Sequence, residues 1–517
     1  MSTPLEQFID HKAQTGMQCG NYDIDLPKLE DGEQYRFHFD ATKCIGCKCC
    51  EVACNEQNNN PADIKWRRVG EVEGGVFPEV SQLFNSMGCN HCVDATCLQG
   101  CPTESYIKID NGIVIHDDES CIGCQYCTWN CPYQVPVFHP ERHIVTKCHM
   151  CYERIERDQT PACVQACPSG AIEIESVNIS DWLEGKIDDE GNAPLTPDAR
   201  ITNSTTRYTL PKNIEKDLKS ADEHILKPEH AHWPLIFMTV FTQASLGGFI
   251  ALVIGELLGI FGLNLQSPSW EMALAVWIPI AIGLPLSALH LGRPLKALSA
   301  MKNIKNSWLS REALALGLFA TFSLAIVILL FFDVNPYIRV MVEIPTMMVG
   351  TYGIYSQAMI YRIKARPSWD RSINVKKFFG VAYIGVLLLA AAALKFDLVA
   401  SSSSIITLAL LVAVIQGFFY LEDINSFDQF EKSYKLYKKH FTIHALFRKI
   451  TFILGALVAP MLASTLIAAN EVSIASTVLI FAVGVALLSE LIDRYLFYVT
   501  VVPLGMPGGF FIGKARD

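Results

Sequence analysis

Cysteine is absent from the chain after Cys167: all eighteen cysteines of this 517-residue protein lie between Cys19 and Cys167. Charged side chains are scarce within the long apolar runs that begin near Pro234. The first 230 residues, in contrast, are polar and acidic, and they are rich in Pro, Asn, Asp and Glu. The sequence therefore predicts a soluble part followed by a membrane-embedded part.

Several other patterns are missing. Residues 1–34 lack the basic-then-apolar pattern of a secretory signal, and the pair Arg67-Arg68 lies too far inside the chain for a twin-arginine signal. We therefore expect the cysteines to bind metal rather than form the disulfides of an exported protein. The net charge of −10 offers no general case for nucleic-acid binding. No glycine-rich nucleotide fingerprint and no nucleophile–base constellation is present, which disfavours an enzyme with its own substrate site.

Sixteen of the cysteines form four groups of four, and three groups end in Cys-Pro. The groups are Cys44, Cys47, Cys50 and Cys54; Cys89, Cys92, Cys97 and Cys101; Cys121, Cys124, Cys127 and Cys131; and Cys148, Cys151, Cys163 and Cys167. Two-residue gaps let three thiolates of one loop converge on a cubane, and a cysteine three residues further on reaches the other cluster of a pair. Zinc also favours Cys-x2-Cys, but it does not need the fourth cysteine followed by proline. The spacing predicts iron–sulfur clusters, with Cys19 and Cys49 as bystanders.

These groups carry a family resemblance. The motifs CIGCKCCEVACNEQN, CNHCVDATCLQGCP, CIGCQYCTWNCPY and KCHMCYERIERDQTPACVQACPSGAI resemble the four-cluster ferredoxin subunit of molybdopterin oxidoreductases, the family of dimethyl sulfoxide, polysulfide and sulfite-oxidising enzymes. The resemblance covers residues 36–175. It implies an α+β ferredoxin-like domain with a duplicated bacterial ferredoxin core and four 4Fe-4S clusters, since Cys124 stands where some relatives have tryptophan. The implied ligand sets are Cys44/Cys47/Cys50/Cys167, Cys54/Cys148/Cys151/Cys163, Cys101/Cys121/Cys124/Cys127 and Cys89/Cys92/Cys97/Cys131.

Eight apolar stretches are long enough to cross a bilayer, which takes about 20 residues. Their expected limits are 234–261, 270–290, 312–332, 336–361, 378–397, 402–421, 449–469 and 474–502. The predicted membrane domain is therefore all-α with eight transmembrane helices. The expected division of the whole chain is an N-terminal extension (1–35), a cluster domain (36–180), a linker or tail (181–231), a membrane anchor (232–507) and a C-terminal tail (508–517). Within the cluster domain, residues 66–84 predict a strand pair with a turn at Gly74-Gly75.

Basic residues are distributed unequally between the loops. The loops after the second, fourth and sixth spans hold most of them, whereas the opposite side offers only Arg339 and Lys395. Because basic loops stay in the cytoplasm, we expect the cluster domain and the C-terminus to face the cytoplasm of a bacterial inner membrane.

The segment SALHLGRPLKALSAMKNIKNSWLSREA, residues 287–313, resembles the haem-free membrane anchor of the same oxidoreductase family. That resemblance covers 232–507 and implies that His290 and Glu312 lie at a quinone pocket. A titratable pair suits quinone chemistry, which moves two electrons and two protons. The alternative is that His290 caps a helix and Glu312 is a carboxylate at a helix start. No paired intramembrane histidines suit a bis-histidine haem, so no haem is expected.

Together these patterns predict an electron-transfer and membrane-anchor subunit that links a separate molybdopterin catalytic subunit to the quinone pool. The cytoplasmic orientation favours a sulfite:quinone oxidoreductase. The alternatives are the quinol-oxidising subunit of an S-oxide, N-oxide or polysulfide reductase, and a module of a larger ion-translocating complex. The last is disfavoured because Glu256, Glu343 and Glu490 are scattered along the sequence. A higher oligomer of the complex stays open.

Overall fold

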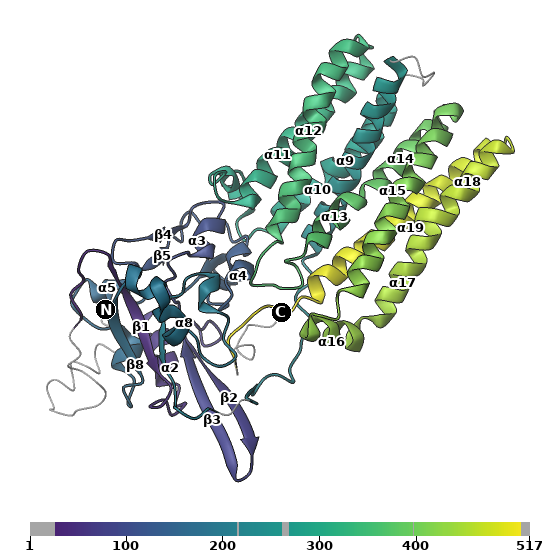
Figure 1. Cartoon of the computed structure of the whole chain (residues 1–517). Coiled ribbons are helices and arrows are strands. Elements are labelled where there is room, and N and C mark those ends of the chain that lie inside the picture. Colours follow the sequence, from purple (N-terminus) through teal and green to yellow (C-terminus); the bar gives the residue numbers. More distant parts are fainter. Residues whose placement is uncertain (1–25, 215–216, 261–267, 397, 508–517) are drawn as a thin grey trace. The chain divides into compact units, whose positions relative to one another are not determined.

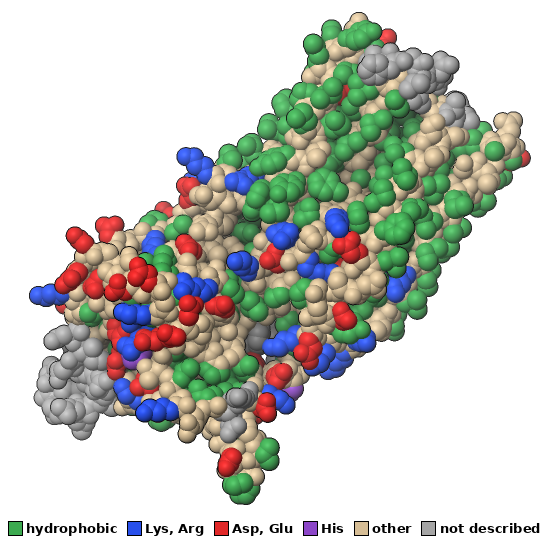
Figure 2. Space-filling view, in the orientation of Figure 1, with side chains coloured by type: hydrophobic (Ala, Val, Ile, Leu, Met, Phe, Trp, Pro, Cys, Tyr) green, Lys and Arg blue, Asp and Glu red, His purple; other side chains and the backbone are tan. Residues whose placement is uncertain are grey.

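The computed structural model describes residues 26–214, 217–260, 268–396 and 398–507. The chain divides into two compact units. The first contains residues 26–226 with 364–366 and 503–507, and the second contains residues 227–363 and 367–502. Charged side chains gather over the first unit, while hydrophobic side chains cover the helices of the second (Figure 2). Cys19 and the tail 508–517 lie outside the described residues.

In the described residues of the first unit the strands form four small sheets (Figure 1). In one, β1 (Glu33–Asp40) pairs antiparallel with β8 (Ile172–Asn178) and parallel with β9 (Arg207–Thr209). In another, β2 (Arg68–Val76) lies between β3 (Glu79–Met87) and β10 (Lys219–Ser220). Two hairpins of equal size complete the set, β4 (Tyr106–Lys108) with β5 (Val114–His116) and β6 (Val137–His139) with β7 (Ile144–Thr146). The unit is thus a small α/β domain.

The strand pair predicted for residues 66–84 is present as β2–β3, but the predicted position of its turn is wrong. The strands join through Phe77-Pro78, and Val76 lies opposite Glu79. Gly74 and Gly75 are instead paired inside the hairpin with Ser81 and Val80. Gly75 adopts a φ of +85°, and a side chain there would collide with the backbone of Glu79. Glycine is therefore needed at these positions because neighbouring backbone segments approach closely, and not because the turn lies there.

Short helices follow the cysteine loops. They are α2 (Cys49–Gln57), α3 (Thr96–Gly100), α4 (Tyr126–Asn130), α5 (Tyr152–Ile155) and α6 (Ala162–Gln165). Cys101 and Cys131 directly follow the last residues of α3 and α4. The helices α3 and α4 therefore carry the polypeptide away from one loop and present the next cysteine at their ends.

Of the predicted linker, residues 181–231, the described part up to residue 226 carries regular structure in the first unit. This part includes α8 (Ile187–Glu190), β9 and β10, and it begins at the last residue of α7 (Ile179–Asp181). Trp182 is fully buried, and its indole N–H donates to the carbonyl of Ser204 over 2.8 Å. The strand β9 extends the sheet that contains β1. This segment is packed rather than free of contacts.

The second unit is all-helical (Figure 1). Its helices are α9 (Trp233–Ile260), α10 (Trp270–Leu289), α11 (Trp308–Phe331), α12 (Pro336–Ile360), α13 (Ser372–Gly380), α14 (Ala382–Lys395), α15 (Val399–Asn425), α16 (Glu431–His440), α17 (Thr442–Phe452), α18 (Ala459–Ala468) and α19 (Val472–Val499). The helices α13 and α14 follow each other as one span, and so do α17 and α18.

In the described part of the chain, seven helical spans are long and apolar enough to cross a membrane. Seven of the eight predicted stretches correspond to them. The eighth, 336–361, forms the continuous helix α12 but does not meet the same measure of apolarity. The reason is local, because α12 carries Arg339, Glu343, Ser356 and Gln357, all buried within the unit.

Small residues let α9 and α14 approach closely. A Cβ on Gly385 would collide with the carbonyl of Ala244, and one on Gly247 would collide with that of Ala382. Both helices are the most buried spans of the unit. Because lipid gives little hydrophobic drive between helices, such glycine contacts are a main source of packing in membrane domains.

Candidate functional site

The first and fourth cysteine groups lie together in the first unit. Burial raises the pKa of Cys44, and the nearby thiols of Cys167 and Cys47 raise it further. Burial also raises the pKa of Cys54 well above its usual value, and the neighbouring thiols of Cys148, Cys151 and Cys163 add to the effect. The structure thus brings together the members of two of the implied sets, with Cys50 beside Cys163 where the two sets adjoin. Burial raises the pKa of Cys50 to about 12, and the nearby thiol of Cys163 contributes.

The second and third groups lie together in the same way. Burial raises the pKa of Cys124 to about 12, and Cys101 and Cys121 contribute. The pKa of Cys97 is raised well above its usual value by burial, with contributions from Cys89, Cys131 and Cys92. At neutral pH such thiols stay protonated by themselves, and iron binding is what stabilises their thiolate form.

Backbone N–H groups point at the cysteine sulfurs. Gly123 and Met150 each donate to the sulfur two residues earlier, Cys121 and Cys148, over 3.4 Å. Gly123 and Met150 both have positive φ, as do the matching residues Gly46 and His91 of the other two loops. A turn in this conformation directs successive amides inward and forms an anion-binding nest. The loops therefore fit an anionic cluster.

Sulfur spacing separates a cubane from zinc. In a tetrahedral zinc site, thiolates 2.3 Å from the metal lie about 3.8 Å apart. Among the described residues, no three cysteine sulfurs lie within 4.8 Å of one another, and the set of metal-binding residue types that does is His38, Glu173 and Glu175. Among the described residues, the cysteine sulfurs are thus not gathered in threes at the spacing of a preformed zinc site.

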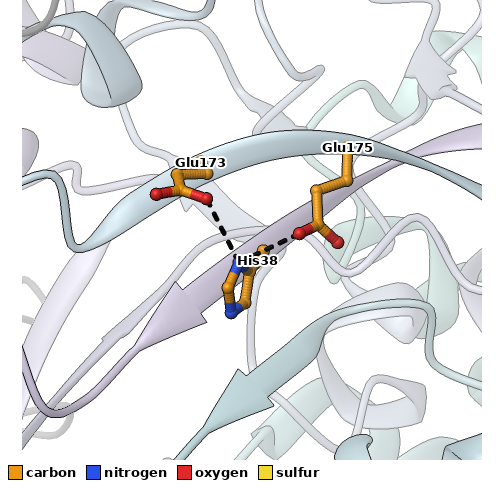
Figure 3. Close-up of side chains that lie close together, drawn as sticks. All are labelled: His38, Glu173 and Glu175. Atoms are coloured by element: carbon orange, nitrogen blue, oxygen red, sulfur yellow. Dashed lines mark ion pairs between the residues drawn. The ribbon is translucent and has the colours of Figure 1, made fainter. Parts of the chain in front are cut away.

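The His38 group is an ion-pair network across the β1–β8 sheet (Figure 3). The Nδ1 atom of His38 lies 3.0 Å from Glu175 and 3.4 Å from Glu173. Arg36 and Arg207 also pair with Glu175, over 2.9 and 3.2 Å. Burial raises the pKa of Glu175, but the bond to His38 and the two arginines outweigh it and lower the pKa to about 2. Fixed cations already neutralise these carboxylates, so the group carries no metal assignment.

Arg67 is a site residue that the spacing of cysteines does not reveal. It is 2% exposed, and the thiols of Cys163, Cys50, Cys148 and Cys54 raise its pKa despite burial, which lowers it. Its guanidinium donates to the hydroxyl of Ser86 over 3.2 Å. The one sequence feature of Arg67 is its place directly before β2, and an arginine on the surface would be equally expected there.

In the second unit, His290 directly follows α10 and lies in an aromatic group. Its ring meets that of His232 edge-on, with centroids 5.0 Å apart, and His232 also contacts Tyr498 at 5.8 Å. The hydroxyl of Tyr498 is hydrogen-bonded to that of Tyr361. His290 is therefore part of a polar and aromatic cluster rather than an isolated helix cap.

Glu312 lies in the second turn of α11 and is 6% exposed. Its Oε1 atom accepts a hydrogen bond of 2.9 Å from Gln357, and Gln357 accepts one of 2.7 Å from Gln243. The carboxyl also lies near Tyr361 and Tyr498. Through Tyr498 the structure brings Glu312 into the same group as His290. The two tyrosines and the two glutamines were not predicted, because nothing in their spacing along the sequence marks them.

Two family profiles match the protein. The profile described as DMSO reductase anchor subunit (DmsC) matches residues 228–499, which is more than half of the sequence. The profile of the 4Fe-4S dicluster domain matches residues 80–177.

Individual proteins are similar as well. The B subunit of the anaerobic dimethyl sulfoxide reductase of Haemophilus influenzae is 37% identical over 199 residues, which cover 37% of this chain and 92% of that protein. The corresponding B subunit of Escherichia coli K12 is 34% identical over 177 residues, covering 33% of this chain and 85% of that protein. The formate dehydrogenase-O iron–sulfur subunit of E. coli K12 is 42% identical over 152 residues, covering 26% of this chain and 50% of that protein.

Proposed function

Because this protein belongs to the dimethyl sulfoxide reductase family, with an iron–sulfur domain fused to a membrane-anchor domain, we propose that it passes electrons between a separate molybdopterin catalytic subunit and the quinone pool. The observation that carries the proposal is the pairing of two features in one polypeptide. One is the packed sets of buried cysteines, and the other is the membrane unit with its buried titratable cluster. The molybdenum site belongs to the partner.

The cluster domain, 36–180, holds four 4Fe-4S clusters in this proposal. Their ligands are Cys44/Cys47/Cys50/Cys167, Cys54/Cys148/Cys151/Cys163, Cys101/Cys121/Cys124/Cys127 and Cys89/Cys92/Cys97/Cys131. The proximity of the thiols within each set and the inward amides support this arrangement. Each cluster, when bound, exchanges one electron, and the protein tunes its potential through sulfur hydrogen bonds and nearby charge.

The anchor, 232–507, crosses the inner membrane eight times in this proposal. The eight spans are the seven apolar spans together with α12. Buried neighbours on α9 and α11 cover its polar residues, so its lower hydropathy is compatible with a place inside a helical bundle. An even number of spans puts the cluster domain and the C-terminus on the same side, and the basic loops support the cytoplasm as that side.

Quinone binds near His290 and Glu312. Imidazole gains and loses a proton near neutral pH in water, so a histidine suits proton exchange with a quinone oxygen. The neighbouring side chains of Tyr361, Tyr498 and His232 provide both apolar ring faces and hydroxyl groups. This combination is typical of pockets that orient a ring through few polar groups.

For the partner's substrate we propose sulfite, because a catalytic subunit docked on a cytoplasmic cluster domain suits a sulfite:quinone oxidoreductase. The second candidate is reduction of an S-oxide or N-oxide with quinol as donor. It is favoured by the names of two similar proteins, which are subunits of anaerobic dimethyl sulfoxide reductases. The same series of clusters serves either direction, and identification of the co-purifying large subunit separates the two.

His290→Gln tests the proposed function. The full-length variant should assemble with its normal cluster content, since the residue belongs to the other unit. After chemical reduction of the clusters, their re-oxidation by a short-chain quinone should slow on the order of 100-fold, because a group that exchanges protons with the substrate is lost. The exposed His440 on α16 supplies a matched control, His440→Gln, with normal kinetics expected. Equal rates in wild type and His290→Gln would remove His290 from the quinone site.

A further inference from the structure

A second polar region of the membrane unit adjoins the His290 group through the rings of Trp369 and Phe497, which contact Tyr361 and Tyr498. A cavity of about 80 Å³ lies among α13, α15, α16, α17 and α19. Its charged lining consists of Arg371, Lys377, Asp423, Arg448 and Asp493. The side chain of Asp423 is 20% exposed, whereas those of Lys377 and Asp493 are 7% and 9% exposed. The cavity therefore extends from the partly exposed carboxylate of Asp423 to the buried side chains of Lys377 and Asp493.

Ion pairs connect the charges inside the cavity. The Nζ atom of Lys377 lies 2.8 Å from Asp423 and 3.0 Å from Asp493. Arg448 approaches Asp493 from α17 over 3.1 Å. Asp493 is thus held at the inner wall of the cavity by cations from two different helices.

Glu490 lies one turn before Asp493 on α19 and is 1% exposed. It faces Tyr383 of α14, Tyr420 of α15 and Arg448 of α17, in addition to Asp493 and Arg494 of its own helix. Oε1 of Glu490 and the hydroxyls of Tyr383 and Tyr420 lie close together, and among the described residues these atoms form no hydrogen bond of normal geometry. Buried polar atoms gathered in this way are where proteins hold internal water.

Arg494 links this region to the quinone group. It lies beside Glu490 and also near Tyr498. Its guanidinium donates to Gln243 over 3.3 Å, and Gln243 donates to Gln357, which in turn donates to Glu312. The Nε atom of Arg494 has no partner among the described residues, so it is a further anchor for water.

We propose that the cavity is a proton inlet of the quinone pocket and that Glu490 carries protons between the cavity and the Arg494–Glu312 end of that pocket. The inference rests on the proposed quinone site. Reduction of a quinone takes two electrons from the clusters and two protons. Glu490 gives a proton toward Glu312 through water beside Arg494 and regains one from the cavity past Asp493. Oxidation of a quinol runs the same route backwards. The amides of Gln243 and Gln357 position Arg494 and Glu312 and carry no proton.

The protein contains a matched control. Glu343 of α12 is also fully buried, and it lies near Arg339 and Glu256, which are paired over 2.6 Å. Between this group and Gln357, α12 presents Gly350, against which Phe319 and Leu246 pack. Apolar side chains thus separate Glu343 from the quinone group, so its carboxyl is no part of the route.

The test uses the full chain in proteoliposomes with chemically reduced clusters and a short-chain quinone as oxidant. We expect Glu490→Gln to slow re-oxidation at least about tenfold, and to flatten its pH dependence and its solvent isotope effect in D₂O. Glu343→Gln should match wild type, and Glu490→Asp should restore part of the rate. If Glu490→Gln does not assemble, Tyr420→Phe removes only a hydroxyl that faces Glu490 and should reduce the isotope effect in the same way.

The outcomes separate this inference from the proposed function. Slow turnover in His290→Gln together with wild-type rate, pH profile and isotope effect in Glu490→Gln overturns the inlet alone. Normal turnover in both variants overturns the quinone site as well. Equal slowing in Glu490→Gln and Glu343→Gln also overturns the inlet, because it shows a general effect of losing a buried carboxyl.

Discussion

Arg67 brings a fixed positive charge among sulfurs of two cysteine sets. Its guanidinium is buried, lies over the ring of Phe37 at 4.5 Å and faces the thiols of Cys50 and Cys163. A cation favours whichever state of a cluster carries more negative charge, which is the reduced state. We therefore expect the residue to raise the reduction potentials of the two adjoining proposed clusters relative to a neutral side chain.

Replacing Arg67 tests this effect. In Arg67→Met the potentials of the clusters bound through Cys50 and Cys163 should fall by roughly 50–100 mV, because an unscreened charge is removed at short range. Redox titration followed by electron paramagnetic resonance measures the shift. The control is Arg36→Met, whose guanidinium pairs with Glu175 on the β1–β8 sheet. Unchanged potentials in Arg67→Met would contradict the electrostatic role.

Among single residues, those that could be predicted to have a functional role are the ones that recur at a regular spacing along the sequence. The cysteine ligands could be proposed from the sequence because the thiols of a ferredoxin-type cluster pair follow a regular spacing along the polypeptide. Arg67 and Tyr498 could not, because their roles depend on neighbours that only tertiary packing supplies. Asp493 and Glu490 illustrate the same limit: α19 reads as an apolar span with isolated charges, and only the neighbouring helices supply their partners.

Among the helices, the crossing of α9 and α14 is determined by backbone contact. Gly385 leaves no room for a side chain against Ala244, and Gly247 leaves none against Ala382. Since α9 also carries Gln243 and Glu256, the distance between these helices sets the position of polar groups in the unit.

Gly385→Leu should therefore separate α9 from α14 and destabilise the membrane unit by about 1–3 kcal/mol, the usual cost of overpacking. The midpoint of thermal unfolding in detergent should fall. Gly484→Leu on α19 is the control, because among the described residues no atom lies within 4 Å of a Cβ built there. A similar fall in both variants would point to a general loss of helix–lipid packing instead.

Most of the helices could be predicted from apolar runs, since a bilayer demands length and apolarity. The exception is α12, which can carry polar residues because it packs against α9 and α11. Its Arg339, for example, pairs with Glu256 of α9. The β2–β3 hairpin shows the opposite case. Its strands could be predicted from the alternation of apolar and polar residues. The position of the turn was predicted wrongly from Gly74-Gly75, because glycine is also needed where two backbones approach closely.

For the whole molecule, the number of clusters is the most direct measurement. Sixteen ligands in four sets predict about sixteen iron atoms per polypeptide, with an equal amount of acid-labile sulfide. Metal analysis of the purified protein measures both. A value near eight iron atoms would leave only two clusters, and stoichiometric zinc would contradict the assignment.

The pairing of β1 with β8 has a consequence for how the protein is made. These strands bring the segment that precedes Cys44 beside the segment that follows Cys167, so sulfurs from opposite ends of the cysteine-rich region meet only when that region is complete. When the first cysteine loop leaves the ribosome, the thiols of the fourth group, which share its proposed clusters, have therefore not yet been synthesised. Insertion of the two proposed clusters that use the first and fourth groups must therefore wait until Cys167 has been made, whereas the other two proposed sets are complete at Cys131. The order of synthesis thus divides the four proposed sites into an earlier and a later pair.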